Sequence, residues 1–206
     1  MKSYKVLLYI LLVASTLMCS KPQNSAVQSI LTEAEAILET HPDSALFKIN
    51  TIPLHTINEL PEADHAHYCL LFTSATDKSY GTHTSDSLIS IAAHYYDKQD
   101  YPQRKMQAWY TMGRVNQDLG DALRAQKYYL KALEEKELVT DFQLIGAIQN
   151  NIGMLYIHQD VCEKGIPYLK DAVRSFEISA DTLRVSFALR DIGRAFSALN
   201  QQDSWI

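Results

Sequence analysis

The chain has 206 residues, of which 24 are acidic and 19 basic, so its formal net charge is −5. This balance excludes the basic surface on which nucleic-acid binding depends. Hydrophobic residues make up 47% of the sequence, enough for a packed core, whereas glycine and proline are sparse, with 7 and 6 copies. Because no run alternates apolar and polar residues as a half-buried strand does, the sequence predicts an all-α protein.

Residues 1–20 have the features of an export signal rather than of a folded element. Lys2 and Lys5 form a positive flank, Val6–Ala14 is an apolar run, and Cys19 follows it closely. The run is shorter than the roughly 20 residues that span a bilayer. With Cys19 in this place, the segment resembles a bacterial lipoprotein signal, which implies acylation of that cysteine and membrane anchoring in the cell envelope, facing the periplasm. Simple cleavage and an uncleaved anchor are the alternatives.

Residues 21–100 predict helices with weak signs of repetition. Apolar residues at helical spacing, bounded by proline, glycine or polar residues, favour four helices. These helices are expected at Ser25–Thr40, Ser44–Thr51, Glu62–Tyr80 and Ser85–Asp97. The stretch Ile52–Pro61 contains prolines at positions 53 and 61 and predicts a connector. This part of the chain is interpreted as degenerate N-terminal helical repeats.

A period of forty residues becomes clear in residues 101–206. The stretch Ala108–Ala132 contains a helical glycine followed by small and aromatic residues, and these types recur forty and eighty positions later. The matching positions are Met112-Gly113, Ala125, Tyr129 and Ala132; then Ile152-Gly153, Gly165, Leu169 and Ala172; then Ile192-Gly193. A glycine inside a helix costs about 1 kcal/mol relative to alanine, so its repetition indicates close contact between helices. The period predicts a solenoid of antiparallel helix pairs.

These motifs resemble the tetratricopeptide repeat family, whose pattern is W-x2-L-G-x2-Y followed by A-x3-F. The resemblance is carried by Trp109-x2-Met112-Gly113, Ile152-Gly153-x2-Tyr156 and Ala125-x3-Tyr129-x2-Ala132. Together with the export signal, it extends to exported tetratricopeptide lipoproteins of Bacteroidetes type. It implies a right-handed α-solenoid. Asn116 departs from the aromatic of the pattern, and the period of about 40 residues exceeds the usual 34.

The end of the sequence predicts an incomplete last repeat. Thr182–Leu199 is expected to form its first helix, and Asn200–Asp203 to begin the turn that follows. Only Ser204–Ile206 remain where a second helix is expected, so Phe187, Ile192 and Phe196 are expected to lack a packing partner. The sequence is therefore interpreted as part of a longer chain, with a naturally short protein as the alternative.

The sequence contains no motif typical of an enzyme or a cofactor site. HExxH, GxSxG, Walker and paired-cysteine patterns are all absent from it. The closest histidines, His65 and His67, are two positions apart and therefore do not share a helix face. The sequence predicts a protein that is not an enzyme, with no catalytic residues, no cofactor and no metal ligands.

The family resemblance implies a peptide-binding groove on the concave face, lined by the first helix of each pair. The residue after each glycine, and the one three positions before it, are expected to point into this groove. These positions are Tyr110, Arg114, Asn150, Met154, Arg190 and Arg194, with Asn151 as a neighbouring candidate. Guanidinium and amide groups suit an extended peptide. The alternative is that Arg114 and Arg194 only pair with Asp118 and Asp191 on the surface.

Three functions are compatible with these observations. The first is a non-catalytic scaffold in the cell envelope that binds a peptide or protein segment in the groove. The second is the sensory, periplasmic portion of a signalling or transcription-regulatory protein whose C-terminal part is missing from this sequence. The third is a glycan-handling lipoprotein, although the aromatic platform that such a protein needs is not evident. In none of the three does this chain bind nucleic acid.

Overall fold

The described part of the chain consists of helices joined by short turns. The computed structural model describes residues 22–203, so the predicted signal segment and Cys19 lie outside the described residues. The elements are α2 (Pro22–Ile37), α3 (Pro42–Ile49), α4 (Leu54–Asn58), α5 (Glu62–Lys78), α6 (Ser87–Asp97), α7 (Pro102–Asp118), α8 (Ala122–Leu133), a 3-10 turn (Lys136–Leu138), α9 (Phe142–His158), α10 (Cys162–Ile178) and α11 (Thr182–Asp203). The prediction of an all-α protein is confirmed.

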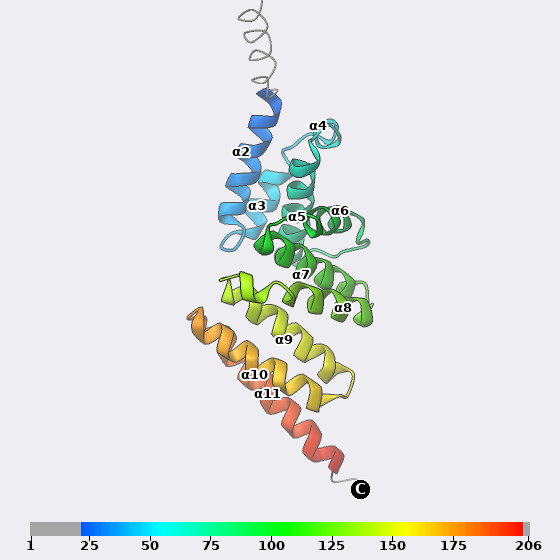
Figure 1. Cartoon of the computed structure of the whole chain (residues 1–206), viewed down its shortest axis with the longest axis vertical. Helices are drawn as coiled ribbons and strands as arrows, with labels where there is room; N and C mark the ends of the chain where they lie inside the picture. Colours follow the sequence, from blue (N-terminus) through cyan, green and yellow to red (C-terminus); the bar gives the residue numbers. More distant parts are fainter. Residues whose placement is uncertain (1–21, 204–206) are drawn as a thin grey trace, which may run out of the picture.

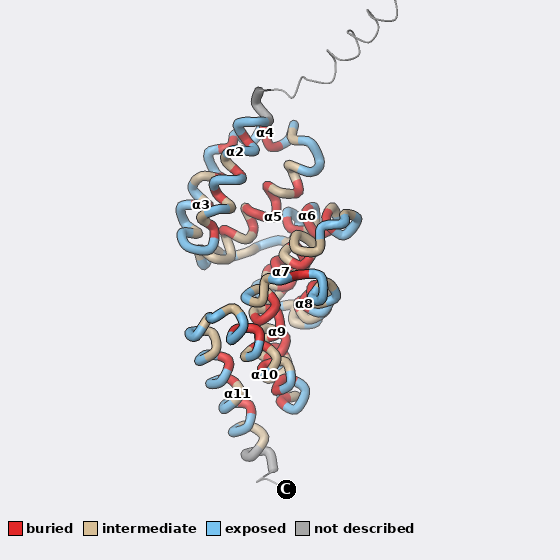
Figure 2. Tube along the Cα trace, turned by 60° about the vertical axis from the view of Figure 1, so that its left-hand side comes forward, coloured by how far each residue is buried: buried red, intermediate tan, exposed pale blue. Residues whose placement is uncertain are grey.

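The helices pack as neighbouring pairs that follow one another along the long axis of the molecule (Figure 1). The pairs are α2 with α3, α5 with α6, α7 with α8, and α9 with α10, and α11 packs against α10. Each pair also contacts the next, through α3 with α5, α6 with α7, and α8 with α9. Buried residues therefore form a band that continues from one pair to the next (Figure 2).

Two stretches that were not predicted to be helical form helix in the structure. The predicted connector Ile52–Pro61 contains the short helix α4, in which Pro53 is the N-cap and Ile57 is buried. The N–H groups in the first turn of a helix have no partner within the helix, so a proline, which has no N–H, costs nothing there. Proline can therefore begin a helix as well as end one. The second difference is at Asn200–Asp203, which continue α11 instead of forming a turn. No glycine or proline interrupts this stretch, and glutamine is a good helix former.

The same type of turn ends α5, α7 and α9. The turns contain Tyr80, Gly120 and Asp160, spaced forty residues apart, with φ angles of 57°, 79° and 58°; Ala180, with a φ of 57°, ends α10 in the same way. In each turn, the N–H of the following residue donates to the carbonyl five positions before it at 2.9 Å. This arrangement is the Schellman cap of a helix, in which a left-handed residue lets the chain reverse. Only Gly120 carries the usual sequence signal for it.

Of the three glycines that recur every forty residues, two lie against a neighbouring helix. A β-carbon added at Gly113 would overlap the ring of Tyr129 on α8, which is fully buried. One added at Gly153 would lie 2.8 Å from Leu169 on α10. Gly193 on α11 differs, since nothing lies within 4 Å of the same position. Close helix contact is therefore confirmed at the first two glycines and absent at the third.

Helix α11 has one covered face and one open face. Ala188, Asp191 and Ala195 are buried on the covered side, and α11 packs against α10 and α9. Phe187 and Phe196 remain 46% and 45% exposed, as expected for a helix without a further neighbour. Among the described residues, no helix is both long and apolar enough to cross a bilayer.

Candidate binding groove

The first helices of successive pairs share a hollowed surface. The first hollow is bordered by α2, α5, α7 and α9, together with the start of α11. Its lining includes Glu35, Leu70, Leu71, Ser74, Asp77, Arg104, Gln107, Tyr110, Thr111, Leu144, Ala147 and Arg184. Apolar side chains line it together with polar and charged side chains, so the surface offers both packing area and hydrogen-bonding groups.

A second hollow continues the first between α7, α9 and α11. Tyr110, Ala147 and Arg184 line both hollows. The second hollow adds Asn150 and Asn151 from α9, Phe176 from α10 and Phe187 from α11. Because they share three residues, we treat the two hollows as one surface and call it the inner groove.

Equivalent positions of different helices line the inner groove. The equivalent sets, with members forty residues apart, are Arg104, Leu144 and Arg184; Gln107, Ala147 and Phe187; Leu70, Tyr110 and Asn150; and Leu71, Thr111 and Asn151. The side-chain type at each position changes from helix to helix. A ligand that lies along the groove therefore meets the same geometry repeatedly, but different chemistry at each step.

Most charged side chains of the inner groove already have partners. Lys78 Nζ lies 2.9 Å from Glu39 Oε2, and Arg104 Nη2 donates to Glu35 Oε2 at 2.8 Å. The remaining lining arginine, Arg184, lies 3.5 Å from the carboxylate of Asp181. The groove consequently has little unpaired charge with which to attract a strongly acidic or basic ligand.

Glu35 joins three helices at one end of the groove. Its carboxylate contacts His67 Nε2 on α5 at 3.1 Å and the Arg104 guanidinium on α7. The hydrogen bond from His67, followed by that from Arg104, lowers the pKa of Glu35 from 4.5 to about 2, although burial acts in the opposite direction. This carboxylate therefore stabilises the fold in its charged form.

This network predicts a loss of stability in acid. Because the folded-state pKa of Glu35 is lowered, its contribution is present above about pH 4.5 and is lost as the pH falls toward 2. We expect it to be about 1–2 kcal/mol after allowance for solvent screening of the partly exposed pair. Urea unfolding of the wild type and of Glu35→Gln at pH 2 to 6 measures it. The difference in unfolding free energy between the two proteins should shrink as the pH falls from 6 to 2; a constant difference would contradict the assignment.

Asn150 contributes a buried side-chain acceptor without a partner to the lining of the second hollow. Its Oδ1 atom is buried and accepts no hydrogen bond within the described structure. A buried acceptor without a partner is costly, by about 1–3 kcal/mol. A ligand that supplies an N–H or O–H group at this point would remove that cost. The inner groove is thus suited to a ligand with hydrogen-bond donors, such as a peptide backbone.

The predicted groove residues occupy different surroundings. Tyr110, Asn150 and Asn151 line the inner groove, and Met154 is half-buried one turn further along α9. Arg114 is held by Asp77, with Nη2 of the guanidinium 2.9 Å from Oδ1 of the carboxylate. The guanidinium also lies 3.8 Å from Asp118, as the surface-pairing alternative predicts.

On α11, the predicted arginines are engaged with an acid. Arg190 and Arg194 lie 3.0 and 3.5 Å from the buried carboxylate of Asp191. The side chains of α11 that line the groove are Arg184 and Phe187, which sequence reasoning missed. They could have been found by counting from a different set of equivalent positions on the helices, since Phe187 lies forty residues after Ala147 and Arg184 forty after Leu144.

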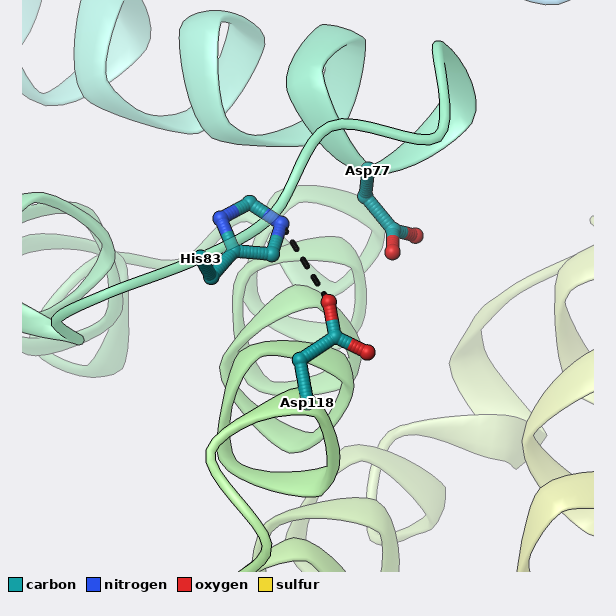
Figure 3. Close-up of side chains that lie close together, drawn as sticks. All are labelled: Asp77, His83 and Asp118. Carbon is teal, nitrogen blue, oxygen red and sulfur yellow. Dashed lines mark ion pairs between the residues drawn. The ribbon is translucent and has the colours of Figure 1, made fainter.

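The structure also gathers three side chains that sequence reasoning did not connect. Asp77, His83 and Asp118 place a carboxylate oxygen, an imidazole nitrogen and a second carboxylate oxygen within 4.8 Å of one another (Figure 3). They come from the end of α5, the loop that follows it and the end of α7. Their separation in sequence gives no motif, so only the fold reveals them.

Comparisons with known proteins give no functional identification. No protein-family model matches the chain, and no curated protein matches it. The crystal structure of BtubC (BKLC) from P. vanneervenii is similar over 86% of this chain and 91% of that chain, with 13% sequence identity and a TM-score of 0.43. A likeness of this degree carries no argument about either fold type or function.

Proposed function

We propose that this protein is a non-catalytic scaffold that binds a peptide or protein segment in the inner groove. In this proposal the chain is a right-handed α-solenoid of tetratricopeptide-like helix pairs with a period of about forty residues. The spacing of the left-handed residues Tyr80, Gly120 and Asp160 and of the groove-lining positions supports this period. Successive helix pairs of this kind form extended binding surfaces.

The observation that carries the proposal is the unpaired acceptor of Asn150 within the groove. Asn150 Oδ1 is buried without a hydrogen bond, beside Asn151 and close to the half-exposed ring of Phe187. Amide groups pair with the N–H groups of a peptide backbone, and an adjacent aromatic ring takes up an apolar side chain. The proposed partner is therefore an extended, largely uncharged segment with an apolar anchor residue.

The proposed place of action is the cell envelope. It rests on the export signal expected in residues 1–20 and on acylation of Cys19, which would anchor the scaffold at a membrane and leave the groove facing the periplasm. In this arrangement a partner in the same compartment can reach the groove.

A selection experiment tests the proposal. The full chain is used to select binders from a displayed library of random peptides, and the dissociation constants of the selected peptides are then measured. The double variant Asn150→Ala/Phe187→Ala should bind them at least about tenfold more weakly, because it loses one hydrogen bond and one aromatic contact. Asn150→Ala alone should not lower the free energy of unfolding, because Oδ1 has no partner in the unbound protein.

The matched control is Leu123→Ala. Leu123 is 76% exposed on α8, away from the groove lining, so this variant should bind selected peptides as the wild type does. Failure to enrich any peptide, or equal affinity of the double variant, would argue against a peptide-binding groove. Saturable binding of oligosaccharides that Phe187→Ala abolishes would instead favour the glycan-handling alternative.

A further inference from the structure

A buried histidine faces two carboxylates at the edge between α5 and α7. His83 belongs to the loop between α5 and α6, Asp77 to the last turn of α5, and Asp118 is the last residue of α7. Figure 3 shows the three side chains converging on a common space, with the imidazole of His83 directed at Asp118. The cluster lies outside the set of side chains on which the proposed peptide groove depends, apart from Asp77.

The buried Nε2 atom of the His83 imidazole has no hydrogen-bond partner. The side chain is only 7% exposed, and its Nε2 atom is buried without a hydrogen bond. The nearest carboxylate oxygen, Oδ2 of Asp118, is 3.9 Å away, which is too far for a hydrogen bond. A buried polar atom in this state is unfavourable unless another group occupies the space in front of it.

We propose that His83, Asp77 and Asp118 bind a divalent cation of the Zn²⁺ class. One imidazole nitrogen and two carboxylate oxygens are ligands that zinc accepts at about 2.0–2.2 Å, whereas Mg²⁺ and Ca²⁺ prefer oxygen ligands alone. The ligand atoms lie within 4.8 Å of one another, so a small inward movement brings them around one ion. The side chain of Asp118 is 28% exposed, which provides an entry path and a position for water.

Arg114 does not prevent this coordination. Its guanidinium donates to both oxygens of Asp77, at 2.9 Å to Oδ1 and 3.2 Å to Oδ2. Each carboxylate oxygen has two lone pairs, so Asp77 can accept from Arg114 and still bind a cation. Such an outer partner fixes the orientation of a metal-binding carboxylate. With the two acids and Arg114 counted together, the charge facing the ion is −1.

The consequence of binding is a link between two neighbouring helix pairs. The ion would tie the loop after α5, which leads into α6, to the end of α7. This segment would then be held at a fixed distance from α7, beside the groove but not within it. The inference does not depend on peptide binding, and its failure would leave the proposed function untouched.

Calorimetric titration of the full chain with Zn²⁺ alone tests the inference. The wild type should bind one equivalent that His83→Ala and Asp118→Asn each weaken by at least about tenfold. His55→Ala is the matched control, since His55 is exposed on α4 and outside the cluster. This variant should bind Zn²⁺ as the wild type does.

Asp118→Asn keeps the test decisive if His83→Ala fails to fold, because Asp118 is an exposed residue at a helix end. Circular dichroism of each variant establishes whether it is folded. Absence of Zn²⁺ binding by the wild type, or the same affinity in Asp118→Asn as in the wild type, would overturn the assignment. Equal weakening by His55→Ala would overturn it too, because binding would then lie elsewhere.

Discussion

Gly113→Ala is expected to lower the free energy of unfolding by about 1–3 kcal/mol, the usual cost of overpacking a core. The added methyl group would overlap the ring of Tyr129, which is fully buried and whose hydroxyl donates to Gln117 at 2.8 Å. The ring cannot turn away without breaking that hydrogen bond. The added methyl group can then be accommodated only if α7 and α8 move apart. Chemical denaturation followed by circular dichroism measures the change.

Gly193→Ala provides the matched comparison on α11. The substitution is chemically the same, but no atom lies within 4 Å of the new methyl group. Here the gain in helix propensity should dominate and raise the free energy of unfolding by about 0.5–1 kcal/mol. The two variants should therefore change stability in opposite directions. Equal effects at both positions would contradict the role of Gly113 as a close-contact residue.

Arg114→Ala is expected to lower the free energy of unfolding by about 2 kcal/mol. The Asp77 side chain is 14% exposed and would be left without its bidentate partner, close to the second acid Asp118. Removing one partner of a fully buried pair costs about 3–5 kcal/mol, and the partial exposure of this pair reduces that figure. The free energy of unfolding from urea titrations at neutral pH measures the effect.

Arg174→Ala is the control for this prediction. Arg174 makes a similar contact with Asp171, but its side chain is 73% exposed. An exposed pair of this kind contributes less than about 1 kcal/mol, so the variant should be close to the wild type in stability. If Arg114→Ala were equally harmless, Arg114 would be available to a ligand after all. If Arg114→Ala does lower the free energy of unfolding as predicted, then Arg114 supports the wall of the groove. Substitutions at this position would in that case change stability rather than ligand binding.

The sequence predicted the helices well because their signals are local. Apolar spacing and bounding prolines and glycines located most helix limits to within a few residues. Gly113 and Gly153 marked the close contacts because only a missing side chain permits them. In contrast, the left-handed turns at Tyr80 and Asp160 lack the glycine that usually marks such a turn in a sequence, and tyrosine in particular rarely adopts this conformation.

The candidate site was less predictable because it depends on helical phase and on loops. Counting from the glycines identified Tyr110 and Asn150 but not Phe187, which requires knowledge of how α11 is rotated against α9. Arg114 looked like a ligand-binding residue because the sequence does not show that Asp77 lies opposite it. Likewise, the position of His83 is set by the path of a loop, for which the sequence has no periodic signal.

Photo-crosslinking from inside the groove, in the native cell, tests the proposed function most directly. A photoreactive amino acid replaces Ala147, which lines both hollows, and in a parallel strain it replaces the exposed Leu123 of α8. We predict a discrete protein or peptide adduct at position 147 that is missing at position 123 and is lost with Asn150→Ala/Phe187→Ala. The same adducts at both positions, or none at position 147, would contradict binding in the inner groove.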